Sequence, residues 1–166
     1  IIALYNISNQ NDVDVKMRVF PLVNWRSFHT VADRSKNSDF TQEQQDETLR
    51  MSFKTPRSSL LIKTTGGQYL TTGHWIERVY LREEDHRGES CFDDCYQPGY
   101  FETLVTAEKT VDFGVIAVAD EREEKATKIF KEMPSTYDAL QKLFQKEKKR
   151  QETFLERFYS VHKNAV

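Results

Sequence analysis

Hydrophobic and polar residues alternate with a period of two over much of the first 119 positions, the pattern of strands with one buried and one wet face. The clearest example is segment 13–19, where four apolar residues are separated by charged ones. Residues 1–8 also predict a strand, and the polar run 8–12 between the two segments favours a turn. These segments are therefore predicted to form an antiparallel hairpin.

Further strands are predicted at 58–65, 68–71, 74–81, 100–105 and 111–119. Gly66 and Gly67 between the first two of these are the signal of a two-residue hairpin. The last segment has apolar residues on both faces, so we expect it to be buried on both sides. The stretch 26–56 is mostly polar and has no sustained period, apart from a short alternation that predicts a strand at 49–53.

The period changes at Asp120, where apolar residues begin to recur at helical spacing. Asp120 and Glu123 predict a capping box at the start of a first helix, and Pro134 is expected to end it. Ser135 is predicted to cap a second helix. Its stretch 145–153 has no apolar residue, which is typical either of a solvated helix or of no stable helix. Strands first and helices last predict a mainly β protein, an antiparallel β-sandwich followed by C-terminal helices.

The segment after Trp75 interrupts this pattern. About seventeen residues, 82–98, are dense in acids and are predicted to be irregular. Loops of that length are uncommon inside compact domains unless they have a function, and binding groups tend to lie on polar loops held by rigid strands. This segment is therefore the first place to look for a site.

The composition narrows the classes of function. The 166 residues suit one domain, and a net charge of −2 gives no reason to expect nucleic acid as a partner. No apolar run approaches the roughly 18 residues of a membrane span. The sequence has no Gly-rich phosphate loop, so a nucleotide cofactor is not expected.

Two cysteines are too few for a secreted disulfide scaffold, so a cytoplasmic location is expected. The chain lacks a start methionine and is expected to be a piece of a longer polypeptide.

Two blocks of sequence carry a family resemblance. The first reads Phe-Pro-Leu-Val-Asn-Trp-Arg-Ser-Phe-His at 20–29, and the second contains Glu83, Arg87-Gly88, Asp93-Asp94 and Pro98-Gly99-Tyr100-Phe101. In order and spacing they resemble the N-terminal domain of the archaeal and bacterial type of glycogen-debranching enzyme, the amylo-α-1,6-glucosidase family. The similarity extends over 13–119. The sequence departs from the family at Phe20, usually arginine, at Asp93, usually glutamate, and at Cys95, usually leucine.

The resemblance implies an architecture. The family's N-terminal domain is a β-supersandwich of the galactose-mutarotase-like type, joined by linker helices to a catalytic barrel of paired α-helices. We therefore expect residues 1–119 to be a sandwich that is incomplete at its N-terminal side. Residues 120–166 are expected to be a helical linker leading to an α/α-barrel catalytic domain that this chain does not contain.

The resemblance also implies a function, hydrolysis of α-1,6 branch linkages in glycogen or a related α-glucan. Because the family's catalytic acids lie in the barrel, this segment is expected to contain no catalytic residue and no cofactor. It would shape one wall of the substrate cleft and pack on the barrel. A stand-alone carbohydrate-binding or protein-interaction module is the alternative. Exposed strand edges leave a homo-oligomer open, and neither nucleic acid nor membrane is an expected partner.

Sugar contact requires paired donors and acceptors for hydroxyls together with an aromatic surface for C–H faces. Trp25 and the two blocks supply that mixture. The candidate substrate-binding residues are Arg26, His29, Arg87, Asp93, Asp94 and Tyr100. The competing hypothesis, which we favour, is that the arginines form ion pairs that pin the loop to the sandwich or the barrel.

The residues in and near segment 82–98 are also compatible with two other chemistries, glycosidic cleavage and zinc binding. Its acids, among them Glu83, Glu84 and Asp85, could provide the two carboxylates of glycosidic cleavage, but loop acids are more often solvated or paired with a nearby arginine such as Arg82 or Arg87. Four potential zinc ligands lie close in sequence, but their spacing lacks a Cys-x-x-Cys, so no metal is expected. They are His74, His86, Cys91 and Cys95.

Overall fold

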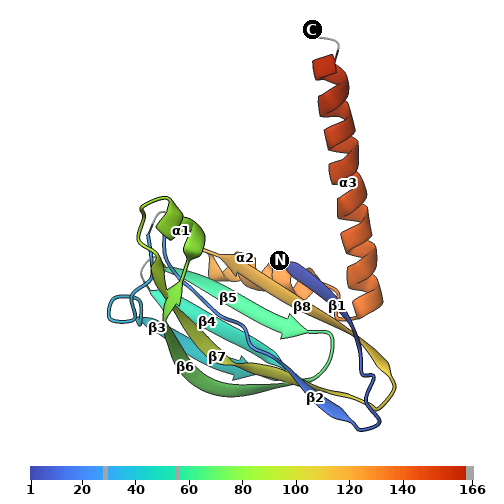
Figure 1. Cartoon of the computed structure of the whole chain (residues 1–166), viewed down its shortest axis with the longest axis horizontal. Helices are drawn as coiled ribbons and strands as arrows, with labels where there is room; N and C mark the ends of the chain where they lie inside the picture. Colours follow the sequence, from blue (N-terminus) through green and yellow to red (C-terminus); the bar gives the residue numbers. More distant parts are fainter. Residues whose placement is uncertain (28–29, 55–56, 164–166) are drawn as a thin grey trace.

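The structure is a computed structural model that describes residues 1–27, 30–54 and 57–163, with side chains up to residue 157. Its strands form two antiparallel sheets, which confirms the predicted β-sandwich (Figure 1). The five-stranded sheet has the order β1 (Ile2–Ser8), β8 (Thr110–Asp120), β5 (Arg57–Thr64), β4 (Thr48–Lys54) and β3 (Phe40–Gln45). The three-stranded sheet has the order β2 (Val15–Val19), β7 (Phe92–Val105) and β6 (Gln68–Tyr80). The helices are α1 (Arg82–His86), α2 (Glu123–Glu132) and α3 (Tyr137–Lys163).

The main core lies between the sheets. Alternate residues of β4 enter it, and Tyr69 and Phe101 meet them from the other sheet. A second core lies on the outer face of the five-stranded sheet, where Leu61 and Ile116 pack against residues of α2 and α3. Since β8 has Phe113 in the first core and Ile116 in the second, the prediction that this strand is buried on both sides is confirmed.

The predicted hairpins were wrong, because apolar alternation tells which face of a strand is buried and not which strand lies beside it. β1 pairs with β8, and β2 pairs with β7 in the other sheet. The turn at Gly66 and Gly67 likewise joins β5 and β6, which belong to different sheets. Gly67 has φ +88°, and a Cβ there would lie 2.5 Å from the carbonyl oxygen of Glu102, so glycine is required where the chain crosses between the sheets.

The segment 82–98 is not the long irregular loop that was expected. Its acids Glu83, Glu84 and Asp85 form the first turn of α1, and β7 begins at Phe92. Pro98 suggested a loop or turn, but it lies in β7 opposite a bulge of β6, between the pairs Gln97–His74 and Gly99–Thr71. A bulge leaves a strand residue without a ladder partner, so proline costs no hydrogen bond there.

The helices follow Asp120 as predicted, but the capping box was wrong. Oδ1 of Asp120, the last residue of β8, accepts a hydrogen bond from the backbone N of Arg122 at 3.0 Å, and α2 begins without a side-chain cap. α2 ends before Pro134. α3 continues through its polar stretch, where Arg150 bonds Glu147 at 2.6 Å one turn away. Figure 1 shows α3 projecting away from the sheets. No helix of the described residues is long and apolar enough to cross a membrane.

A partly buried hydrogen-bond network links the two sheets around Tyr69, which is itself only 1% exposed. Gln42 of β3 donates to the Tyr69 hydroxyl at 3.2 Å and to the carbonyl oxygen of Pro98 at 2.8 Å, and it accepts from the Tyr96 hydroxyl at 3.0 Å. Burial raises the pKa of Tyr69 to about 12.

The pKa of Tyr69 gives a testable prediction. In the unfolded chain a tyrosine ionises near its ordinary pKa of about 10, whereas Tyr69 in the folded chain holds its proton until about 12. Its contribution to stability is therefore complete below pH 10 and is lost as the pH rises toward 12, by roughly 1–2 kcal/mol after solvent screening. Urea unfolding at pH 9 and pH 11.5 measures this loss. The loss should be smaller in Tyr69→Phe, and an equal loss in the two proteins would contradict the assignment.

Candidate functional site: a cleft beside helix α1

An open cleft of about 640 Å³ lies beside α1. Figure 1 shows α1 at one end of the sandwich. It is formed by the segment that follows β2 and by the connection between β6 and β7. Its lining residues are Arg26, Thr30, Val31, Leu81, Glu84, Arg87, Glu89 and Ser90. The cleft thus brings together two of the predicted site residues, Arg26 and Arg87, from sequence blocks far apart in the chain.

Asp93 lies behind Arg26 and is only 3% exposed. Its Oδ2 accepts hydrogen bonds from Nε of Arg26 at 3.0 Å and from Nδ2 of Asn24 at 2.7 Å, and its Oδ1 accepts one from the backbone N of Ala32 at 2.5 Å. Both carboxylate oxygens are therefore used within the protein. The hypothesis of an arginine–carboxylate pair that holds the loop is confirmed for Arg26, and Asp93 positions this arginine rather than facing the cleft.

Asp94 holds the neighbouring part of the same loop. Its Oδ2 accepts from the backbone N of Arg34 at 2.8 Å, and its Oδ1 accepts from the backbone N of Arg78 at 2.9 Å. Successive residues of a strand point to opposite sides, so Asp93 and Asp94 fix the loop from two directions. Asp94 is not among the residues that line the cleft.

Arg87 is the exposed arginine of the cleft. Its Nη1 lies 3.3 Å from Oε1 of Glu84, and its side chain is 68% exposed. An exposed pair of this kind contributes little to stability, about 0–1 kcal/mol. Its guanidinium is therefore accessible from the cleft.

The other predicted site residues lie elsewhere. Tyr100 is further along β7, roughly 20 Å from Asp93 at the usual rise of a strand. Its ring contacts Phe20, with centroids 5.3 Å apart, and the guanidinium carbon of Arg18 at 4.8 Å. Trp25, expected as an aromatic surface for sugar, stacks on Phe53 inside the sandwich at 4.7 Å. His29 lies outside the described residues.

Comparison with known families agrees with the resemblance found in the sequence. A family model described as "Glycogen debranching enzyme N terminal" matches residues 1–112. The chain belongs to this family. No curated protein matches it. The structure adds that this debranching-enzyme N-terminal domain contributes residues from both sequence blocks, Arg26 and Arg87, to one cleft.

Most of the acids beside the cleft of this debranching-enzyme domain are paired. Glu83 bonds Arg82 at 3.0 Å, and Asp85 accepts from the Tyr80 hydroxyl at 2.7 Å. With Glu84 bound to Arg87, these contacts agree with the prediction that the loop acids are paired. Glu89 also lines the cleft.

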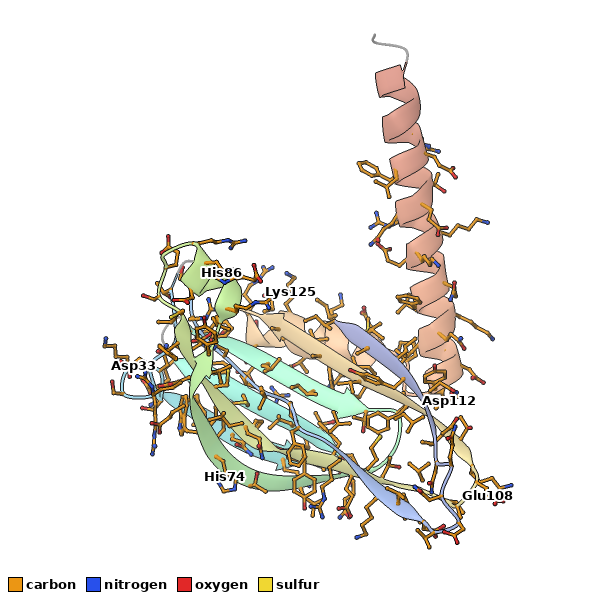
Figure 2. The ribbon with its side chains drawn as sticks, in the orientation of Figure 1. Asp33, His74, His86, Glu108, Asp112 and Lys125 are labelled. Carbon is orange, nitrogen blue, oxygen red and sulfur yellow. The ribbon has the colours of Figure 1, made fainter. Side chains whose placement is uncertain are left out.

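The four potential zinc ligands do not converge. Figure 2 shows His86 on α1 and His74 well away from it, on β6. Among the described residues no group of three or more histidine, cysteine, aspartate or glutamate residues is placed to hold a metal ion. Cys91 and Cys95 are both free thiols. Burial, together with the neighbouring Asp85, raises the pKa of the Cys91 thiol.

Five lining residues were not predicted from the sequence: the polar Thr30, Glu89 and Ser90 and the apolar Val31 and Leu81. Serine and threonine in a polar loop carry no distinguishing pattern, so their own positions gave no signal. The only usable signal was their proximity in sequence to Arg26 and Arg87. Ser90 and both arginines lie within the two blocks that carry the family resemblance, and Thr30 directly follows the first block.

Proposed function

We propose that this chain is the non-catalytic N-terminal domain of an amylo-α-1,6-glucosidase and that its cleft forms part of the wall along which the α-glucan lies. The observation that carries the proposal is the convergence of Arg26 and Arg87 on one open cleft. Arginine N–H groups donate to sugar hydroxyls, while carboxylates such as Glu84 and Glu89 accept from them. Thr30 and Ser90 add hydroxyls that do both.

The chemistry of the reaction is assigned to another part of the enzyme. Hydrolysis of an α-1,6 linkage needs one carboxylic acid and one carboxylate placed across the scissile bond. In this domain Asp93 is buried with both oxygens hydrogen-bonded, and Glu84 is paired with Arg87. The domain therefore binds and orients the glucan. Acid–base catalysis belongs to the helical barrel expected for this family.

The C-terminal helices are proposed to lead to that barrel. Three apolar side chains on the projecting α3 are strongly exposed: Phe144 at 47%, Phe154 at 69% and Leu155 at 51%. An apolar groove of about 630 Å³ at the foot of α3 involves Phe144, Leu60 and Ile129. A helical partner would cover both surfaces.

The supersandwich assignment, the cytoplasmic location and the oligomeric state remain predictions.

Binding of maltoheptaose, a linear α-glucan, tests the role of the cleft. Arg87→Ala is expected to weaken binding about tenfold, since a hydrogen bond to a charged group contributes roughly 1.5–3 kcal/mol. Stability should change by less than about 0.5 kcal/mol, because the Arg87–Glu84 pair is exposed. Isothermal titration calorimetry measures the affinity, and thermal unfolding measures the stability.

Arg82→Ala is the matched control. Arg82 is on the same helix, its side chain is 72% exposed and it is paired with Glu83, but it does not line the cleft. Equal affinities of Arg87→Ala and the unmodified chain would overturn the proposed cleft. The unmodified chain should also release no glucose from a branched limit dextrin. Release above background would overturn the assignment of catalysis to another part of the enzyme.

A further inference from the structure

The opposite side of the β6–α1–β7 connection carries a pair of exposed aromatic rings. Tyr80 and Phe92 are directly paired across the two strands, with ring centroids 5.7 Å apart. They are 50% and 42% exposed. Leu81, the next residue along the chain, lines the cleft, and consecutive residues of an extended chain point to opposite sides. The aromatic pair therefore forms a surface separate from the cleft.

Arg78 completes one side of this surface. Its guanidinium carbon lies 4.2 Å from the centroid of the Phe92 ring. Its backbone has φ +60°, a left-handed conformation that is unfavourable for arginine, at the β6 bulge between Ile76 and Val79. Asp94 accepts a hydrogen bond from the Arg78 backbone N at 2.9 Å and holds it there. Strained backbone fixed by a separate anchor is frequent at binding sites.

Asp85 of α1 completes the other side. Its Oδ2 accepts a hydrogen bond from the Tyr80 hydroxyl at 2.7 Å. This bond raises the pKa of Tyr80 and fixes its hydroxyl against α1. The surface thus offers two exposed rings, a cation and a carboxylate. The charges of Arg78 and Asp85 cancel, so the surface suits a neutral ligand better than an ion.

We propose that the surface formed by Arg78, Tyr80, Asp85 and Phe92, here called the aromatic platform, is a second contact site for α-glucan. A pyranose ring has apolar C–H faces that stack on aromatic rings and hydroxyls that pair with carboxylates and guanidinium groups. Arg78 covers part of Phe92, so Tyr80 is the main stacking surface. The choice of α-glucan as the ligand rests on the proposed function. The platform itself rests on its own residues, on the other side of the connection from the cleft.

Maltoheptaose titration followed by NMR of the aromatic and arginine side chains tests this inference on the whole chain. Shifts are expected at Tyr80 and Phe92 as well as at Arg87. Tyr80→Ala should weaken binding at the platform roughly three- to tenfold, in line with the strength of aromatic contacts. Tyr80→Phe keeps the ring and loses only the bond to Asp85, so its loss should be smaller. Tyr5→Ala removes a ring on β1 that is 47% exposed, and it should have no effect.

The outcomes separate the two proposals. Loss of affinity in Arg87→Ala, with no shift at Tyr80 or Phe92, overturns the platform and leaves the cleft. Shifts at the platform, with unchanged affinity in Arg87→Ala, overturn the cleft and leave the platform, and shifts at neither place overturn both. If Tyr80→Ala weakens only the attachment of a protein partner, the platform is a protein contact and the inference is wrong. Should Tyr80→Ala fail to fold, the NMR shifts of Tyr80 and Phe92 in the unmodified chain still decide the question, because absence of both shifts overturns the platform.

Discussion

Replacing Asp93 with alanine is expected to destabilise the domain by about 3 kcal/mol and to abolish the ordered position of Arg26 at the cleft. The carboxylate is 3% exposed and receives hydrogen bonds from Arg26, Asn24 and the backbone N of Ala32. Removing one partner of a buried charge network leaves the others desolvated without partners, which typically costs 3–5 kcal/mol. The lower end applies because the Arg26 side chain is 27% exposed and can regain water. Urea unfolding measures the change.

Glu83→Ala is the matched control for that prediction, since it also removes a carboxylate paired with an arginine. Glu83 and Arg82 are 66% and 72% exposed, so the control should change stability by less than about 1 kcal/mol. Asp93→Asn should fall between the two, because its amide oxygen still accepts from one donor. If Asp93→Ala were as stable as Glu83→Ala, the loop would be held by contacts other than this carboxylate.

The sequence singled out candidate residues by type, while the position and contacts of each residue required coordinates. Asp93 and Asp94 looked like sugar ligands because carboxylates and arginines in a polar loop have the right composition. Composition does not reveal which carboxylate oxygens already accept hydrogen bonds within the protein. Tyr100 shares its sequence block with Asp93 but lies far along the same strand, because the block is extended β structure and not a folded loop. Arg87 and Arg26 are the two candidates that line the cleft, and their contact with sugar stays a prediction.

For the fold, the sequence predicted which faces are buried and where helices replace strands. Leu49, Met51 and Phe53 were recognised as a strand, and all three are in the main core. β3 was missed because Gln42 and Gln44 are polar, although the amide groups of both side chains bond to Tyr69 of the other sheet. The pairing of the strands was also not predicted. β1 lies beside β8, more than a hundred residues away, and local pattern has no information about partners at that distance.

Gly99 of the Pro-Gly-Tyr-Phe motif is the position where a single added methyl group should have the largest effect. A Pro-Gly pair is typical of a turn, but Pro98 and Gly99 both lie inside β7. A Cβ at Gly99 would lie 2.2 Å from the carbonyl oxygen of Leu70 and 2.8 Å from the Tyr69 hydroxyl oxygen. The Leu70 oxygen belongs to the backbone of the paired strand β6. It can move away from a new Cβ only if β6 and β7 separate. Overpacking in a core usually costs 1–3 kcal/mol, and a backbone contact belongs at or above the upper end. Gly99→Ala is therefore expected to lose about 3 kcal/mol or more of stability in thermal or urea unfolding.

Gly66 and Gly88 provide graded controls for Gly99→Ala. At Gly66 a Cβ meets nothing within 4 Å, so Gly66→Ala should be nearly neutral. Gly88 has equal space but φ +73°, so Gly88→Ala should cost about 1 kcal/mol through backbone strain alone. The expected order of destabilisation is therefore Gly99, then Gly88, then Gly66. If Gly99→Ala lost no more stability than Gly88→Ala, β6 and β7 would not approach each other as closely at this motif as they do in the structure. Strand packing would then not explain the motif.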